Sequence, residues 1–113
     1  MRRPRSAKLV GGVVWGVGMA LHEEPLVDYR TGRYVNADLA EYHVPVNADI
    51  GRLDLSFVDE DDPYVNPIGV KGMGEIGITG IAAAIANAVY NATGVRVRNL
   101  PITLGKVLAT TRA

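Results

Sequence analysis

The residues best suited to chemistry lie in a glycine-rich loop, Gly69 to Gly80, which reads Gly-Val-Lys-Gly-Met-Gly-Glu-Ile-Gly-Ile-Thr-Gly. Five of its twelve residues are glycine, so its backbone can adopt positive φ and approach another group closely. Glu75 is the last acidic residue of the chain and the only one in this loop, which makes it a candidate for acid–base chemistry. The alternative is a first-turn acid that offsets the dipole of the following helix by about 0.3–1 kcal/mol. Spacing alone slightly favours the alternative.

Other patterns give weaker signals. Residues 72–77 match G-x-G-x-x-G, but a dinucleotide site also needs a preceding strand and an acid about twenty residues further on. Pro67 lies just upstream and no acid follows, so we disfavour that site and keep a simple phosphate-binding loop as a minor hypothesis. The two histidines stand apart, and we predict no metal ligands. The acidic run 59–62 is interpreted as a solvated loop ahead of Pro63 rather than as a cation site.

Composition limits the function classes. A chain of 113 residues with 48% apolar residues is one small domain or a piece of a larger one. Its twelve basic and twelve acidic residues balance, and no cationic face with interleaved aromatics is apparent, so nucleic-acid binding is not expected. The absence of cysteine excludes disulfides, thiolate nucleophiles and cysteine-bound zinc or iron–sulfur clusters within this chain.

The N-terminal region imitates a signal peptide. A basic start, residues 1–8, precedes an apolar run, residues 9–21, and Arg2-Arg3 resembles a twin-arginine signal. Thirteen residues are too few to cross a bilayer as a helix, which takes about twenty. Four glycines and Trp15 within the run instead predict a helix packed tightly against another element. We therefore expect no membrane segment and place the protein in the cytoplasm, with the periplasm as the alternative.

The periodicity of apolar residues predicts an α+β fold with two buried helices, a hairpin and short strands. The helices cover residues 7–22 and 78–92, and we expect both to be buried over most of their circumference, the second ending at Gly94. The remaining predicted elements are a hairpin (25–29 and 33–36, with its turn at 30–32), a helical turn (38–42), strands (52–58 and 95–98) and a closing short helix (101–109).

Read in order, several blocks of sequence resemble one enzyme family. They are Gly-Gly-Val-Val-Trp-Gly-Val-Gly-Met-Ala-Leu (11–21) with Glu-Glu (23–24), Thr-Gly-Arg-Tyr-Val-Asn (31–36), Asp-Leu-Ala-Glu-Tyr (38–42), Gly-Val-Lys-Gly-Met-Gly-Glu (69–75), Ala-Ala-Ile-Ala-Asn-Ala-Val (83–89) and Leu-Pro-Ile-Thr (100–103). The ordered set resembles the C-terminal end of the molybdopterin-binding subunit of the xanthine dehydrogenase and aldehyde oxidase family, and is most similar to the bacterial aldehyde oxidase type. The resemblance covers about residues 5–108.

The resemblance implies a role for the glycine-rich loop. In that family the glutamate of this loop, here Glu75, is the general base beside molybdenum, and Gly72, Met73 and Gly74 would contact the molybdopterin cofactor. The implied reaction is hydroxylation of an aldehyde or heteroaromatic carbon with water as the oxygen source. Iron–sulfur clusters and FAD would be held by partner chains. Lys8 stands where the family commonly has a glutamine that reaches the cofactor.

Two hypotheses follow. In the first, residues 1–113 are a single partial domain with a divergent stub at residues 1–8, which is inactive alone and is completed by the rest of the subunit and by iron–sulfur and flavin subunits. A start codon inside a longer reading frame would explain the stub. In the second, the chain is a non-catalytic remnant or interaction module that docks on a partner through its glycine-rich helix. With both helices apolar all round, we expect the isolated chain to be poorly folded or to form homo-oligomers. The sequence does not specify the substrate.

Overall fold

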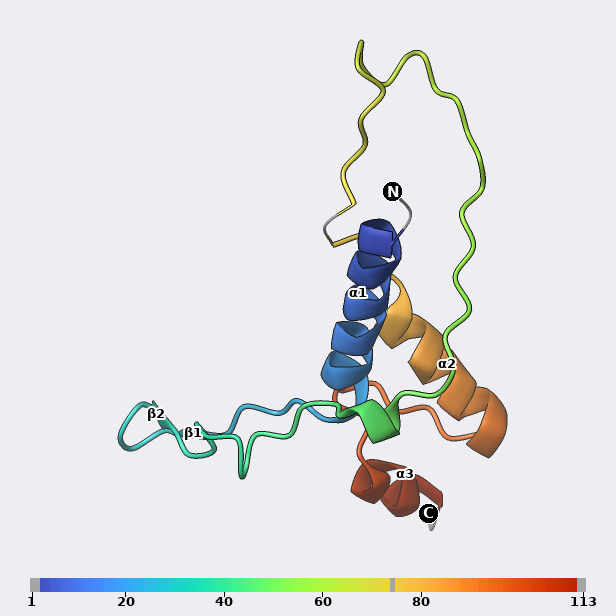
Figure 1. Cartoon of the computed structure of the whole chain (residues 1–113). Helices are drawn as coiled ribbons and strands as arrows, with labels where there is room; N and C mark the ends of the chain where they lie inside the picture. The colour runs from blue at the N-terminus through green and yellow to red at the C-terminus, as the bar shows by residue number, and fades with distance from the viewer. Residues whose placement is uncertain (1–2, 74, 112–113) are drawn as a thin grey trace.

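The computed structural model describes residues 3–73 and 75–111, and this part of the chain is mostly helical (Figure 1). In chain order the elements are α1 (Arg3–Leu21), β1 (Val27–Asp28), β2 (Arg33–Tyr34), the 3-10 helix η1 (Asn47–Asp49), α2 (Ile81–Thr93) and α3 (Leu104–Thr111). The predicted α+β class is therefore confirmed in part, with three helices and a single two-stranded hairpin in the described residues.

Helices α1 and α2 pack together, and glycines of α1 form the contact (Figure 1). A methyl group added at Gly12 would lie 2.8 Å from the Cα atom of Gly77, and one at Gly16 would lie 2.5 Å from the Cβ atom of Ile81. Both distances are too short for a real Cβ atom, so only glycine permits this approach. The predicted close packing of the glycine-rich helix is confirmed at these two positions.

A small core forms where α1 ends. Ala20 is fully buried, and Val95 and Ile102, which follow α2, are 6% and 5% exposed. The Ile102 N–H donates to the Ala20 carbonyl oxygen over 2.6 Å, which attaches the segment between α2 and α3 to the end of α1. The last helix then begins after Thr103, whose hydroxyl oxygen accepts a hydrogen bond from the N–H of Lys106.

The hairpin, the C-terminal cap of α2 and the turn at residues 38–42 form where the sequence predicts them. Strands β1 and β2 pair antiparallel, with Val27 opposite Tyr34, and Gly32 in the turn has a φ of +66°. Gly94 ends α2 in the left-handed conformation, and its N–H donates to the Tyr90 carbonyl oxygen. Residues 38–42 form the expected single turn, closed by the Tyr42 N–H and the Asp38 carbonyl oxygen. The hairpin projects from the helices as an arm (Figure 1).

Two predicted strands are wrong. Residues 52–58 and 95–98 have no regular structure, and in the first segment Leu53, Leu55 and Phe57 are 37–40% exposed. The alternation of apolar and polar residues is present in both segments, but a strand needs a neighbour for its backbone hydrogen bonds. No other strand lies beside either segment in the described part of the chain. Instead, residues 51–73 form a long excursion that returns to the N-terminal end of α1 (Figure 1).

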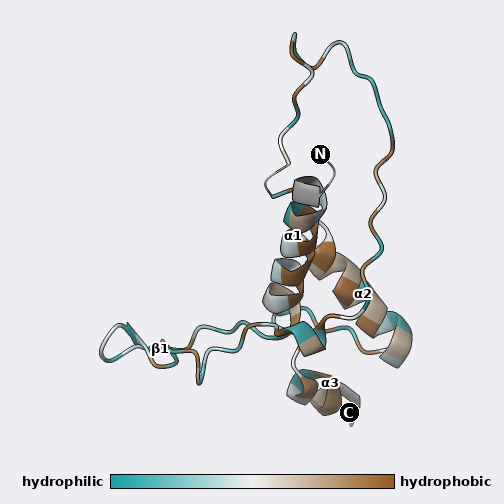
Figure 2. Cartoon of the chain, viewed as in Figure 1, coloured by the Kyte–Doolittle hydropathy of each residue, from teal (hydrophilic) through white to brown (hydrophobic). Residues whose placement is uncertain are grey.

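The prediction of two helices buried over most of their circumference is also wrong. No residue of α2 is buried, and Trp15 and Met19 of α1 are 57% and 39% exposed. Helix α2 begins at Ile81 rather than at residue 78, because residues 75–80 form successive turns around Gly77. The apolar residues of α1 and α2 have too few neighbouring elements in this chain to cover them (Figure 2).

The chain exposes more surface than a compact domain of its mass. Its accessible surface is 9230 Å², whereas a folded monomer of 12.1 kDa exposes about 6,000 Å². Its radius of gyration is 18.0 Å, compared with about 13 Å for a compact domain of similar length. The chain therefore has a more open shape than a compact domain of this length.

The glycine contact predicts different effects for two neighbouring substitutions. Gly12→Ala should loosen α1 from the loop at Gly77, because the added methyl group meets backbone atoms and overpacking costs about 1–3 kcal/mol. Gly11→Ala is the matched control: it has open space and should stabilise α1 by about 0.5–1 kcal/mol. Amide hydrogen exchange across α1 should be faster in Gly12→Ala and slower in Gly11→Ala. Equal exchange in the two variants would contradict the packing described here.

Candidate functional site

The carboxylate of Glu75 is available for chemistry. Glu75 lies in an exposed bend, six residues before Ile81, the first residue of α2. Helix α2 has no acid in its first turn, so the interpretation of Glu75 as a first-turn acid is wrong. Among the described residues, its side chain makes no hydrogen bond or ion pair, and only its backbone carbonyl is used, as the acceptor for the Ile78 N–H.

Helix α1 positions the loop through backbone packing. A methyl group added at Gly77 would lie 2.9 Å from the Leu9 carbonyl oxygen and 3.3 Å from the Cα atom of Gly12. Glycines on both sides of the contact let the two backbones meet without side chains between them. Since Gly77 is two residues from Glu75, this contact fixes where the chain leaves the candidate base.

The loop also lines a pocket. This pocket has a volume of about 520 Å³ and lies between the start of α1 and the returning excursion, lined by Lys8, Val58, Glu60, Asp61, Asp62, Val65, Gly69, Val70, Lys71 and Met73. The structure thus brings together Met73 and Lys8, two positions that the resemblance placed at the cofactor. Gly72 lies beside them with open space around its Cα atom, and the predicted contact Gly74 lies outside the described residues.

The acidic run at residues 59–62 is a largely exposed loop, as predicted, and two of its carboxylates contact a lysine. Glu60 Oε2 and Asp62 Oδ2 lie 3.2 and 3.4 Å from the ammonium nitrogen of Lys71. The interpretation of the run as a solvated loop is confirmed, and the sequence did not reveal its pairing with Lys71. The described residues contain no group of three His, Asp or Glu side chains that could hold a metal ion.

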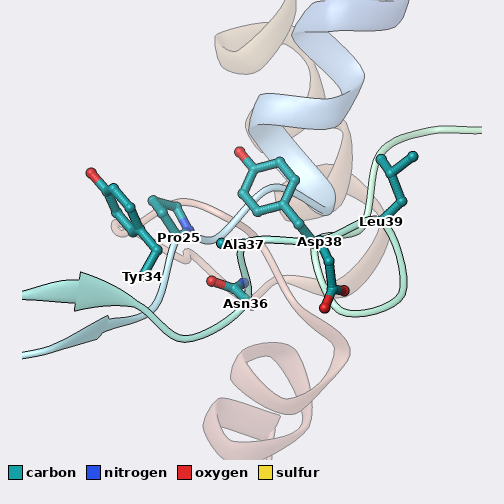
Figure 3. A pocket seen from close by; sticks show the side chains of 7 residues that line it. Pro25, Tyr34, Asn36, Ala37, Asp38 and Leu39 are labelled. Atoms are coloured by element: carbon teal, nitrogen blue, oxygen red, sulfur yellow. The ribbon is translucent and has the colours of Figure 1, made fainter.

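A second pocket, of about 380 Å³, lies at the base of the hairpin arm (Figure 3). The buried Asn36 lines this pocket, and its side chain links the two ends of the hairpin. It accepts a hydrogen bond from the Leu26 N–H and donates one to the Glu24 carbonyl oxygen, each over 2.8 Å. The Tyr42 hydroxyl, on the pocket wall, donates to Glu23 Oε2 over 3.1 Å. These partners are 10–19 residues apart in sequence, so no spacing pattern pointed to them.

The environment of Tyr42 changes its acidity. Partial burial raises the pKa of the Tyr42 phenol above its ordinary value of 10.0, and the hydrogen bond to the Glu23 carboxylate raises it further. Removing the proton would leave two negative charges side by side. Tyr42 and Glu23 therefore form a connection between the end of α1 and the turn at residues 38–42 that persists at neutral pH.

The chain is similar in sequence to molybdopterin-binding proteins. Residues 6–51 match the family described as molybdopterin cofactor-binding domain. The chain is 52% identical over 107 residues to the aldehyde oxidoreductase molybdenum-binding subunit PaoC of Escherichia coli strain K12, a match that covers 93% of this chain and 15% of that subunit. It is 41% identical over 93 residues to the xanthine dehydrogenase molybdenum-binding subunit of Escherichia coli O157:H7, covering 82% of this chain and 12% of that subunit.

The fold is similar to part of a solved enzyme. Quinoline 2-oxidoreductase from Pseudomonas putida 86 contains a segment that superposes with a TM-score of 0.81 at 26% sequence identity. The superposition covers 95% of this chain and 14% of that chain. This chain thus spans 12–15% of the length of the relatives it matches. None of the described helices is both long and apolar enough for a membrane span.

The contact between Tyr42 and Glu23 predicts a late-titrating tyrosine. Because the folded chain holds the pKa of Tyr42 above 10.0, the contribution of this contact to stability is present below that pH and is lost as the pH rises through the folded-state pKa. Glu23→Gln should lower that pKa, because it removes the negative charge beside the phenol. The ultraviolet absorbance of tyrosinate measures the titration, with Tyr42→Phe assigning the component and Glu24→Gln as the control. Unchanged titration in Glu23→Gln would contradict the assignment.

Proposed function

Because this chain belongs to the family of molybdopterin-binding subunits of the molybdenum hydroxylases, we propose that it supplies the part of such a subunit that carries the catalytic base. The complete enzyme would hydroxylate an aldehyde or a heteroaromatic compound with water as the oxygen donor. The observation that supports this proposal most is the state of the Glu75 side chain. Among the described residues it makes no hydrogen bond or ion pair, and it lies on a loop held by α1.

Glu75 acts in this proposal as the general base. Its carboxylate takes a proton from the attacking oxygen nucleophile, a contribution to the rate of roughly 10²–10⁴. A base must be held within hydrogen-bond reach of the proton it removes. The contact between Gly12 and Gly77 supports this requirement, since it anchors the backbone two residues after Glu75 without a side chain between loop and helix.

The molybdenum cofactor, when bound, would supply the oxidising centre. The pocket beside the loop would form only one wall of the cofactor site. The backbone at Gly72 is open to close approach, and Lys8 and Met73 line the same pocket. Three carboxylates line it as well, so it does not form the cationic cradle that a phosphate group requires. We therefore propose contacts with the cofactor only for Gly72, Met73 and Gly74. Lys8 cannot accept a hydrogen bond as the family's glutamine does, so we expect most other contacts to come from the remainder of the subunit.

The surplus surface supports the proposed partners. About 3,000 Å² beyond the surface of a compact chain of this mass stays exposed, and it includes the apolar faces of α1 and α2. Exposed apolar patches of more than a few hundred Å² mark interaction surfaces. The rest of the molybdopterin subunit would cover this surface, iron–sulfur and flavin subunits would take up the electrons, and the assembly would lie in the cytoplasm.

The alternative of an interaction module gains no support from the helix assigned to it. That hypothesis used the glycine-rich helix as the docking surface, but Gly12 and Gly16 already contact Gly77 and Ile81 of the same chain. A partner could therefore not use these two glycines and would have to contact the exposed face of α1 that carries Trp15. This leaves the base-bearing segment as the function that the arrangement supports best.

The test uses a hybrid enzyme. The matching segment of the Escherichia coli aldehyde oxidoreductase subunit, 107 residues long and 52% identical, is replaced by the corresponding residues of this chain. Glu75→Gln in this hybrid should lower turnover of an aldehyde at least about 100-fold, because the general base is lost while the shape is kept. Molybdenum content should stay equal to that of the parent hybrid.

Glu41→Gln is the matched control, since Glu41 is an exposed glutamate in the turn at residues 38–42 and lies outside the loop. It should keep parental turnover and parental molybdenum content. A Glu75→Gln hybrid that retains near-parental turnover would refute the assignment of the base.

A further inference from the structure

We propose that Lys71, held by Glu60 and Asp62, is a positioning residue that anchors the loop carrying Glu75 on its N-terminal side. The catalytic role of this anchor rests on the proposed function, whereas the anchor itself can be tested in this chain alone. Lys71 lies four residues before Glu75, and Gly77 lies two residues after it. The candidate base therefore sits between two attachments, one ionic and one made by backbone packing.

The ionic attachment joins distant parts of the excursion. The ammonium nitrogen of Lys71 lies 3.2 Å from Glu60 Oε2 and 3.4 Å from Asp62 Oδ2, across eleven and nine residues of sequence. Exposure of the side chains rises from 33% for Asp62 through 48% for Lys71 to 69% for Glu60. Ordering the lysine side chain costs conformational entropy once, while two carboxylates attract its ammonium group. The two contacts together are therefore more stable than a single exposed ion pair.

The turn before Lys71 makes this attachment geometrically possible. The side-chain oxygen of Asn66 accepts from the N–H groups of Ile68 and Val70, each over 3.1 Å, and Gly69 adopts a positive φ of +64°. This turn reverses the excursion and brings Lys71 back beside the acidic run. Among the described residues of the excursion, the contacts of Lys71 are the only ion pairs that join positions more than two residues apart.

The anchor gives the acidic run a role. One end of the pocket beside the loop is built from Glu60, Asp62 and Lys71, and Met73 lines the same pocket two residues further on. If the ionic attachment opens, the chain before Glu75 loses its contact with the acidic run, and Gly72, which has no side chain, does not restrict it. The loop would then sample many positions, and the carboxylate would be within reach of its proton for a smaller fraction of the time.

The experiment measures amide hydrogen exchange of Val70 and Ile78 in the 113-residue chain, because their N–H groups are hydrogen-bonded, to Asn66 Oδ1 and to the Glu75 carbonyl oxygen. Lys71→Glu should speed exchange at these residues about threefold to tenfold, since it replaces attraction by repulsion on both acids. The triple exchange Lys71→Glu, Glu60→Lys, Asp62→Lys should restore the parental rates within about twofold. Molar salt should speed exchange in the parent but not in Lys71→Met, because salt screens exposed charges.

The control is Arg52→Glu, which breaks a more exposed ion pair in the same excursion, with Asp54, at 3.0 Å and two positions away in sequence. It should leave exchange at Val70 and Ile78 unchanged. In the hybrid enzyme, Lys71→Glu should lower kcat by the same factor as the change in exchange, with little change in KM, and the triple exchange should restore kcat.

Parental exchange in Lys71→Glu, failure of the charge exchange to restore it, or an equal effect of Arg52→Glu would overturn the anchor. These results are separate from the test of the base. A Glu75→Gln hybrid with full turnover would remove the catalytic meaning of the loop, while the exchange measurements would still decide whether Lys71 holds it.

Discussion

The contact between Gly12 and Gly77 is the constraint on which the rest of the structure depends. It brings the backbone of α1 against the turn that precedes α2, at a distance that no side chain would permit. A neighbouring contact, in which Gly16 packs against Ile81, the first residue of α2, holds the start of that helix against α1. The contact between Gly12 and Gly77 also determines where the Glu75 loop can lie. Stability and placement of the candidate base therefore come from the same few glycines.

A backbone contact of this kind has a functional advantage over one made by side chains. Side chains can change rotamer and carry a loop with them, whereas two packed backbones leave little freedom. A general base needs a fixed distance to its proton, and a displacement of about 1 Å can cost a factor of about 100 in rate. Close packing at Gly77 on one side and the ion pairs of Lys71 on the other meet this need with few residues.

The open shape has the same origin. Close packing in this chain is concentrated where α1 meets the start of α2, and few other elements cover the outer faces of these helices. The surface of 9230 Å² and the projecting hairpin arm follow from this arrangement. The match to 12–15% of the length of larger relatives agrees with it, since such a segment would find its missing cover in the surrounding protein.

Local signals in the sequence predicted local structure well. Gly94 as a cap, Gly32 in the hairpin turn and the glycines of the first helix each report a backbone requirement that depends on near neighbours, and the structure confirms them. The strands at 52–58 and 95–98 failed because alternation reports which side of a segment is apolar and not whether a partner strand exists.

Signals that depend on distant residues were missing from the sequence. The contacts of Lys71 with Glu60 and Asp62, and of Tyr42 with Glu23, join residues 9–19 positions apart and required the structure. For the candidate site, the order of short motifs identified the family and suggested Glu75. Spacing alone had favoured an acid in the first turn of a helix, and the start of α2 at Ile81 excludes that interpretation.

The most direct test of the central claim is a crystal structure of the hybrid aldehyde oxidoreductase with its cofactor bound. The account predicts that Gly12 and Gly77 remain in backbone contact and that the Glu75 carboxylate faces the molybdenum centre within hydrogen-bond reach of its ligands. A structure in which the contact is kept but Glu75 points into solvent, away from the cofactor, would contradict the claim that this chain carries the catalytic base.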